Sequence, residues 1–279
     1  MGSLLSLAAA AVAAFPLGQH VSAPAAHAFP HASVAAAKVG LPAASTPAAP
    51  RPKALLRELR ACGKALYNSS AYRCLRDERR SPLASSGLYC TVTIYAYASV
   101  RVRYNISYGG QALFAGSRKI PRRTIFHLAV YYELPIVLPA GRYACTFTAV
   151  GKSARAKISG GGQAGAVVEP AVCSPLHLST VGNCTADESA APLAPTSSLT
   201  CSGYFVGRQG RFGAVELVYS NNGVWTSMSK REGSIGKSII GAFLTAPSAV
   251  GQTYAPGQYA CRFIVDGQTV VEKPFSVRA

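Results

Sequence analysis

Acidic residues, histidine and tryptophan are all scarce in this sequence. Its 279 residues include 11 Asp and Glu, 5 His and 1 Trp. Carboxylates this sparse do not supply the several oxygen ligands of a calcium site. Only His127 and His177 lie beyond residue 53, and no Cys-x-x-Cys pair occurs, so the spacing of a tetrahedral zinc site is absent. We expect no metal and no cofactor.

Recognisable catalytic motifs are lacking as well. The sequence contains no Gly-x-Ser-x-Gly motif and no phosphate-binding loop. His127 and Glu133 alternate onto one strand face but lie ~20 Å apart along an extended chain, too far to share a proton transfer. Asp187 and Glu188 lie in a Ser/Thr-rich loop without a histidine near them in sequence. We expect a protein that is not an enzyme, and catalysis assembled from distant residues is the alternative.

No apolar run is long enough to cross a bilayer as a helix. The longest begins at Leu4 and ends at Leu17, which is shorter than the ~20 residues that a span requires. The small-residue pattern Ala26-His27-Ala28 follows it. We therefore expect a signal peptide over residues 1–28, no integral membrane segment in the mature chain, and a secreted, periplasmic or cell-wall-associated protein.

Cysteine, in contrast, occurs eight times and in a repeated pattern. The two quartets are Cys62, Cys74, Cys90, Cys145 and Cys173, Cys184, Cys201, Cys261. Successive gaps are 12, 16 and 55 residues in the first quartet and 11, 17 and 60 in the second. Residues 141–145 (GRYAC) return as residues 257–261 (GQYAC). This pattern indicates a tandem duplication of one disulfide-stapled domain in an oxidising compartment.

The regions between the cysteines predict mostly β-strands. Residues 89–104 alternate between apolar and polar side chains, and we expect this stretch to bend near Ala98-Ser99 because 16 residues is long for one strand. Further strands are expected over residues 124–134, 142–150, 214–219, 238–244, 258–265 and 270–277, separated by Gly-containing turns. Residues 53–66 have apolar positions at three- and four-residue spacing and predict a short amphipathic helix.

Composition divides the chain into five segments. We expect a signal peptide over residues 1–28, an Ala/Pro-rich extended spacer over 29–53, a basic first domain over 54–158, a Gly-rich linker over 159–170 and a second domain over 171–279. Each domain consists of several short strands with little helix, which favours a β-sandwich.

The repeated Gly-x-Tyr-x-Cys motif, with a partner cysteine upstream, resembles the strand-F end of bacterial immunoglobulin-like domains. The resemblance covers about 70 residues of each copy. It implies an all-β protein of two tandem immunoglobulin-like antiparallel β-sandwiches, in which Cys90–Cys145 and Cys201–Cys261 bridge the sheets. Tyr143 and Tyr259 would then be corner tyrosines whose hydroxyls bond back to the loop backbone. Sequence proximity pairs the other cysteines as Cys62–Cys74 and Cys173–Cys184.

Positive charge is concentrated in the first copy. Residues 1–160 contain 20 Lys and Arg against 4 Asp and Glu, a net charge of +16, whereas residues 161–279 contain 8 against 7, a net charge of +1. A basic surface attracts polyanions over ~8–10 Å in physiological salt. A GC-rich genome that accumulates surface arginine is the alternative explanation, but it would charge both copies alike.

An aromatic and basic stripe marks the candidate ligand-binding surface. We expect it on the outward face of residues 89–104, extended by the basic segment 117–123. Its members are Tyr95, Tyr97, Arg101, Arg103, Arg118, Lys119, Arg122 and Arg123. Such residues stack on sugar rings and neutralise phosphates or sulfates. The alternative is an ordinary solvated strand face, because Thr, Tyr and Arg also occur on strands without a ligand.

These observations favour a secreted, non-enzymatic binding or adhesion protein whose first domain binds an anionic polymer or cell-envelope polysaccharide. A secreted protease inhibitor is an alternative, because Arg118-Lys119 or Arg122-Arg123 would present a trypsin-like bait. A structural spacer is a third reading, and a protein partner also remains open.

Overall fold

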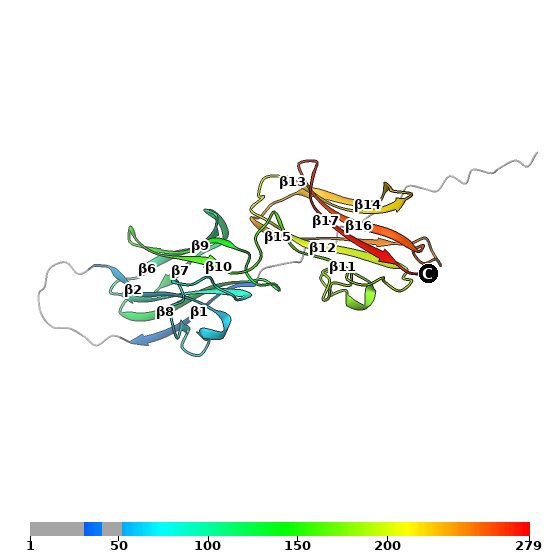
Figure 1. Cartoon of the computed structure of the whole chain (residues 1–279). Coiled ribbons are helices and arrows are strands. Elements are labelled where there is room, and N and C mark those ends of the chain that lie inside the picture. The colour runs from blue at the N-terminus through cyan, green and yellow to red at the C-terminus, as the bar shows by residue number, and fades with distance from the viewer. Residues whose placement is uncertain (1–30, 41–51) are drawn as a thin grey trace, which may run out of the picture.

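A computed structural model describes residues 31–40 and 52–279, and consists almost entirely of antiparallel strands (Figure 1). We call β1 to β10 domain 1 and β11 to β17 domain 2. The strands of domain 1 are β1 (His31–Gly40), β2 (Ala54–Gly63), β3 (Tyr67–Asn68), β4 (Arg73–Cys74), β5 (Gly87–Ala96), β6 (Val100–Tyr108), β7 (Gln111–Ile120), β8 (Thr124–Glu133), β9 (Gly141–Ala149) and β10 (Lys152–Gly160). Those of domain 2 are β11 (Val167–Cys173), β12 (Ser198–Val206), β13 (Phe212–Asn221), β14 (Val224–Ser234), β15 (Ile239–Pro247), β16 (Gly257–Val265) and β17 (Gln268–Val277). Two single-turn 3₁₀ segments, η1 (Lys64–Leu66) and η2 (Pro175–His177), occupy matching places.

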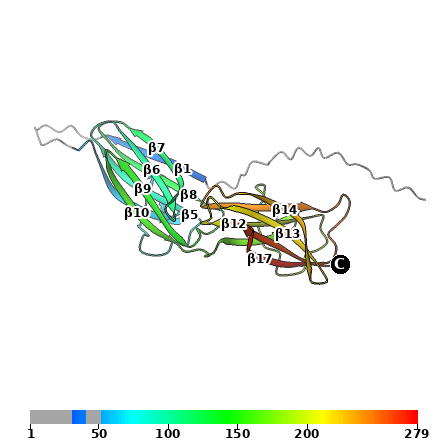
Figure 2. The same cartoon turned by 90° about the horizontal axis from the view of Figure 1, so that it is seen from above.

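Each domain is a sandwich of two sheets. In domain 1 the strand orders are β1-β8-β5-β2 and β10-β9-β6-β7, and in domain 2 they are β11-β12-β15 and β14-β13-β16-β17. All of these pairings are antiparallel. The expected all-β, antiparallel sandwich class is therefore confirmed. Figure 2 shows the two sandwiches end to end.

The four disulfides pair as expected. Cys90–Cys145 joins β5 to β9, and Cys201–Cys261 joins β12 to β16, so each links the two sheets of its sandwich. Cys62–Cys74 and Cys173–Cys184 close short loops of 12 and 11 residues beside β2 and β11. No described cysteine is free. Four disulfides indicate an oxidising compartment.

The predicted helix over residues 53–66 is wrong, because most of that stretch forms strand β2. β2 contains a bulge between Arg57 and Arg60, with Glu58 at φ 49°. The bulge adds a residue to the alternation, and this produces the three- and four-residue apolar spacing of a helix. Domain 2 contains the equivalent bulge in β11, between Val168 and Ala171, where Glu169 also has φ 49°.

The segment boundaries also differ from those expected. Residues 31–40 of the expected spacer form β1, which pairs with β8 along its whole length and belongs to domain 1. The expected linker is shorter, because β10 continues to Gly160 and β11 begins at Val167. The expected signal peptide and the remaining spacer residues 29–30 and 41–51 lie outside the described residues.

The Gly-x-Tyr-x-Cys motif has the same structural role in both copies. Gly141 and Gly257 have φ of 151° and 156°, and a Cβ there would lie 2.4 and 2.7 Å from the rings of Tyr108 and Tyr219. Only glycine accommodates that backbone and that contact. The Tyr143 hydroxyl donates to the Pro139 carbonyl at 3.1 Å.

The second copy repeats the tyrosine contact, as the Tyr259 hydroxyl donates to the Ala255 carbonyl at 2.7 Å. Burial raises the pKa of Tyr259 to about 12 and also raises the pKa of Tyr143. Both hydroxyls therefore remain donors throughout the physiological pH range.

The two sandwiches share a buried apolar junction. Val168, Tyr204, Val206 and Ile239 of domain 2 belong to the same buried cluster as the core of domain 1. All four are at most 5% exposed. Burial raises the pKa of Tyr132 in domain 1, and the nearby Tyr204 adds to that shift. The domains are thus packed together rather than merely tethered.

Candidate functional site

The tyrosines and arginines of the expected stripe lie on different sheets. Tyr95 is on β5 and Tyr97 follows that strand, whereas Arg101 and Arg103 are on β6. The chain turns between Ala96 and Val100, near the expected bend, and β5 and β6 belong to opposite sheets. Alternation keeps the side chains pointing outward, but the turn moves them to the other side of the sandwich. The expectation that these tyrosines and arginines form one continuous stripe is therefore wrong.

The basic segment 117–123 is divided in a similar way. Lys119 pairs with Arg101 and shares its outward face. Arg118 pairs with the buried Val102, so it projects on the other side of β7, where its guanidinium lies 5.5 Å from the ring centre of Phe126. Arg122 and Arg123 are exposed in the turn between β7 and β8.

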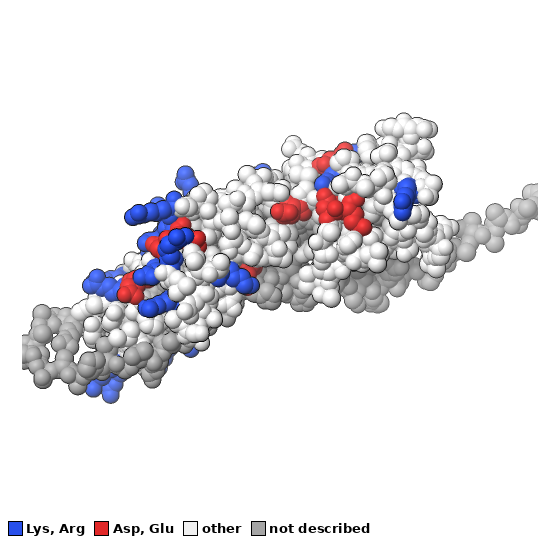
Figure 3. All heavy atoms as spheres, turned by 60° about the horizontal axis from the view of Figure 1, so that its bottom comes forward, with Lys and Arg blue, Asp and Glu red and all other residues white. Residues whose placement is uncertain are grey.

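Strands β9 and β10 add three cations to the face that carries Arg101, Arg103 and Lys119. The register places Arg142, Arg155 and Lys157 on the same outward side, because the intervening residues Tyr143, Ala156 and Ile158 are buried in the core. We call this surface of the sheet β10-β9-β6-β7 the basic face. Its six cations are Arg101, Arg103, Lys119, Arg142, Arg155 and Lys157, and all are exposed. Figure 3 views the molecule from the side of β1 and β8, the other sheet of domain 1, and shows Lys and Arg lying among Asp and Glu on that domain.

None of these six cations forms an ion pair within the described part of the chain. Within residues 52–279, the only polar side-chain contact of their cationic groups is between the Arg101 guanidinium and the Ser117 hydroxyl, at 3.1 Å. The four carboxylates of residues 1–160 are all engaged elsewhere. Glu58 accepts from Thr93, Asp77 and Glu78 accept from backbone amides of β2, and Glu133 contacts Tyr89 and Lys64. The basic face therefore has unneutralised charge.

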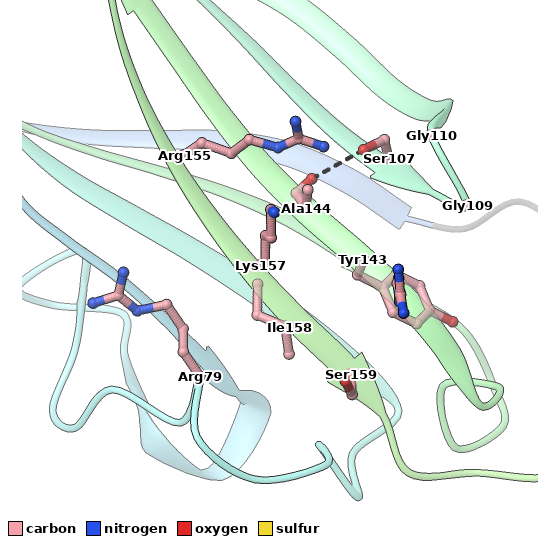
Figure 4. Close-up of a pocket in the computed structure, with 11 residues that line it drawn as sticks. Arg79, Ser107, Gly109, Gly110, Tyr143, Ala144, Arg155, Lys157, Ile158 and Ser159 are labelled. Atoms are coloured by element: carbon pink, nitrogen blue, oxygen red, sulfur yellow. Dashed lines mark hydrogen bonds between the residues drawn. The ribbon is translucent and has the colours of Figure 1, made fainter.

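A depression of about 730 Å³ lies at one end of the basic face. Its cationic lining comprises Arg79, Arg142, Arg155 and Lys157. Figure 4 shows Arg155 and Lys157 projecting from one strand beside Ala144, whose carbonyl accepts from the Ser107 hydroxyl at 3.5 Å. Arg79 reaches it from a separate loop and is paired with Asp77. The floor combines hydroxyl and cationic donors, which suit an anionic group.

The corresponding face of domain 2 has a different charge pattern. The residues at the six equivalent positions are Phe212, Ala214, Ser234, Gln258, Glu272 and Pro274. Two cations of this sheet are paired: Arg262 with Glu272 at 2.6 Å, and Lys230 with Glu232 at 2.8 Å. Arg262 also lies 5.5 Å from the Trp225 ring centre. Domain 2 has the same scaffold without the basic face.

Sequence reasoning missed Arg142, Arg155 and Lys157. The signal was present, since Arg155 and Lys157 are two residues apart and alternate with the apolar Ala156 and Ile158. Without a strand assigned to residues 152–160, that alternation had no structural meaning.

The acidic pair Asp187-Glu188 fastens a loop to the backbone. Asp187 accepts from the Val172 amide at 3.1 Å, and Glu188 accepts from the Ser174 amide at 2.6 Å. Asp77 and Glu78 bond to the Ala61 and Gly63 amides in the same way. Burial by itself raises the pKa of both aspartates, but hydrogen bonds outweigh it and lower the pKa. These carboxylates hold the disulfide loops in both copies.

His127 lies 3.1 Å from the Thr93 hydroxyl, which donates to Glu58. Among the described residues, no three His, Cys, Asp or Glu side chains gather as metal ligands. Within the same residues, no helix is long and apolar enough to cross a membrane.

No family model and no curated protein matches the chain. Three solved structures are partly similar to it. They are Salmonella alpha-2-macroglobulin reacted with methylamine (12% identity, TM-score 0.25), β-D-mannosidase from Dictyoglomus thermophilum (8%, 0.26) and Bifidobacterium dentium β-glucuronidase complexed with coumarin-3-O-glucuronide (11%, 0.26). The matches cover 69%, 68% and 89% of this chain and 14%, 29% and 47% of those chains. Similarity this low does not bear on function.

Proposed function

We propose that this is a secreted, non-enzymatic binding protein, built from two immunoglobulin-like sandwiches, whose domain 1 binds an anionic polymer through the basic face. The observation that supports the proposal is the set of six exposed cations without a carboxylate partner. Surface charges usually attract counter-charges within the protein, and a face that lacks them favours an external anion. The immunoglobulin-like assignment is supported by strand order, inter-sheet disulfides and corner tyrosines.

The layout of the basic face favours a polymer over a single small anion. The six cations come from all four strands of the sheet, and neighbouring strands are ~4.8 Å apart. One phosphate or sulfate contacts only two or three such side chains at once. A chain of repeating anionic groups contacts the whole face and releases counterions along its length. Polysaccharide with carboxylate, sulfate or phosphate groups, as in a cell envelope, is the ligand class we propose.

Chromatography on immobilised heparin, used as a model polyanion, tests the site. Replacing Arg142, Arg155 and Lys157 together with Gln is expected to lower the salt concentration at which the protein elutes, because half of the basic face is neutralised. The matched control replaces Arg57, Arg73 and Arg122 with Gln, which removes the same charge from exposed positions outside the face. The control is expected to elute close to the unmodified protein.

Two results would contradict the proposal. Failure of the unmodified protein to bind heparin at low salt would remove the anionic ligand. An equal shift in both triple variants would show that net charge, rather than the basic face, determines retention.

A further inference from the structure

Almost every sheet edge in the described part of the chain carries a feature that prevents pairing with another chain. All five bulges between paired strands lie on edge strands, namely β2, β7, β11, β14 and β17. β10 has Lys152, Arg155 and Lys157, and β1 contains Lys38. Bulges, prolines and charged residues are the means by which proteins protect unpaired edges.

The edge strand β15 has none of these features over residues 239–246. It contains no charged residue and no bulge, and its only proline is Pro247 at its end. β15 pairs with β12 on one side, and no described strand lies on its other side. Its equivalent in domain 1, β8, is ten residues long and is covered over that whole length by β1. Among the residues that the structure describes, no strand covers β15 in the way that β1 covers β8.

A groove of about 410 Å³ runs beside this edge. Its lining includes the apolar Ile240, Ala242 and Phe243 of β15. Three charged residues also line it, Arg231, Glu232 and Lys237, and the Arg231 guanidinium lies 4.7 Å from the Phe243 ring centre. Apolar surface is therefore available next to the unpaired backbone. Main-chain hydrogen bonds and adjacent side-chain pockets together are what strand addition uses.

We propose that two copies of this protein associate through β15, pairing antiparallel about a twofold axis to form one continuous six-stranded sheet. An uncharged strand is complementary to itself in this arrangement, and full-length pairing places Phe243 opposite its own copy. The charge of domain 2 favours a second copy as the partner. Residues 161–279 carry a net charge of only +1, so two such domains approach without strong repulsion.

The dimer would present two basic faces. Two linked sites bind a long polymer more tightly than one, because the second contact is intramolecular. The pairing itself does not rest on the proposed function, since it depends only on β15.

Sedimentation velocity on the full chain over a range of concentrations tests the pairing. The unmodified protein is expected to form a concentration-dependent dimer that persists in ~1 M salt, because screening at that salt removes surface charge attraction but not strand pairing. Thr245→Lys in β15 is expected to weaken the dimer roughly tenfold or more, since lysine on an edge opposes pairing. Thr226→Lys makes the same change in the bulged edge strand β14 and is the matched control.

A second variant separates charge from local structure. Thr245 contacts the Thr200 hydroxyl at 3.0 Å, so Thr245→Val loses that contact without adding charge and is expected to remain dimeric. Hydrogen exchange should show β15 amides protected on dimerisation while β8 amides stay unchanged. Loss of protection in β8 would mean that β1 of the second copy had moved to β15, and would overturn self-pairing. A monomer at all concentrations, or equal weakening by both lysine variants, would overturn it as well.

Discussion

The outer faces of β10-β9-β6-β7 and β14-β13-β16-β17 occupy the same place in the two sandwiches but differ in charge. Domain 1 has Arg155 and Lys157 where domain 2 has Glu272 and Pro274. The cation Arg262 on the domain 2 face is bound to Glu272, whereas the basic face has no carboxylate partner. The inter-sheet disulfides and the corner-tyrosine hydrogen bonds occur in both domains, so they account for the stability of the shared fold. The difference between the faces is therefore where function is to be sought.

Charge reversal on the basic face is expected to have the largest effect. Arg155→Glu combined with Lys157→Glu should weaken binding to heparin by ~100-fold or more, because two attractive contacts become repulsive. Arg57→Glu with Arg73→Glu is the control, which makes the same charge change on β2 and β4, outside the basic face. Isothermal titration at low salt measures both. A comparable loss of heparin affinity in the two variants would contradict the assignment of binding to the basic face.

Transferring charge to domain 2 is expected to have a smaller, opposite effect. Gln258→Arg and Glu272→Arg, introduced into the triple Gln variant of domain 1, should restore heparin affinity by roughly tenfold. Both positions match cations of the basic face. Glu169→Arg with Gln252→Arg adds the same charge outside that sheet and should restore less. Equal recovery in both would show that the location of charge on domain 2 is irrelevant.

The corner tyrosines should contribute equally to the two copies. Tyr143→Phe and Tyr259→Phe each remove one buried hydrogen bond and are expected to lower the free energy of unfolding by about 1 kcal/mol. Chemical denaturation monitored for each domain measures the two losses. A loss confined to one copy would mean that the motif has diverged in structure as well as in sequence.

The smallest expected effect is on acid stability. Because the folded-state pKa values of Asp77 and Asp187 are lowered, both contribute stability above their unfolded pKa of about 3.9. That stability is lost as the pH falls through the lower folded-state values. Asp77→Asn and Asp187→Asn should each reduce the fall in melting temperature between about pH 6 and pH 3. If the melting temperature of both variants fell with pH as much as that of the unmodified protein, these carboxylates would not contribute to stability as proposed.

Features fixed by local pattern could be predicted from the sequence. Matching cysteine spacings indicated the duplication, the resemblance to immunoglobulin-like domains implied the two disulfides that bridge the sheets, and sequence proximity suggested the two short loops. Clear alternation predicted strands such as β8 and β16. β2 was missed because the bulge at Glu58 changes the spacing of apolar residues to that of a helix.

The composition of the basic face could not be predicted in the same way. Tyr95 and Arg101 lie close in sequence, yet the turn after Ala96 moves them to opposite sheets. Arg103 and Arg155 lie far apart in sequence, yet pairing of β6 and β10 with β9 brings them to one face. Alternation tells which side of its own strand a residue occupies. It does not tell which strands share a sheet.

Lysine acetylation footprinting with a sulfated polysaccharide tests the central claim most directly. Lys119 and Lys157 lie on the basic face, whereas Lys64 and Lys230 are exposed elsewhere, one on each domain. We predict that the polysaccharide slows modification of Lys119 and Lys157 and leaves Lys64 and Lys230 unaffected. Equal protection of all four lysines, or protection of Lys230 alone, would contradict the assignment of binding to the basic face of domain 1.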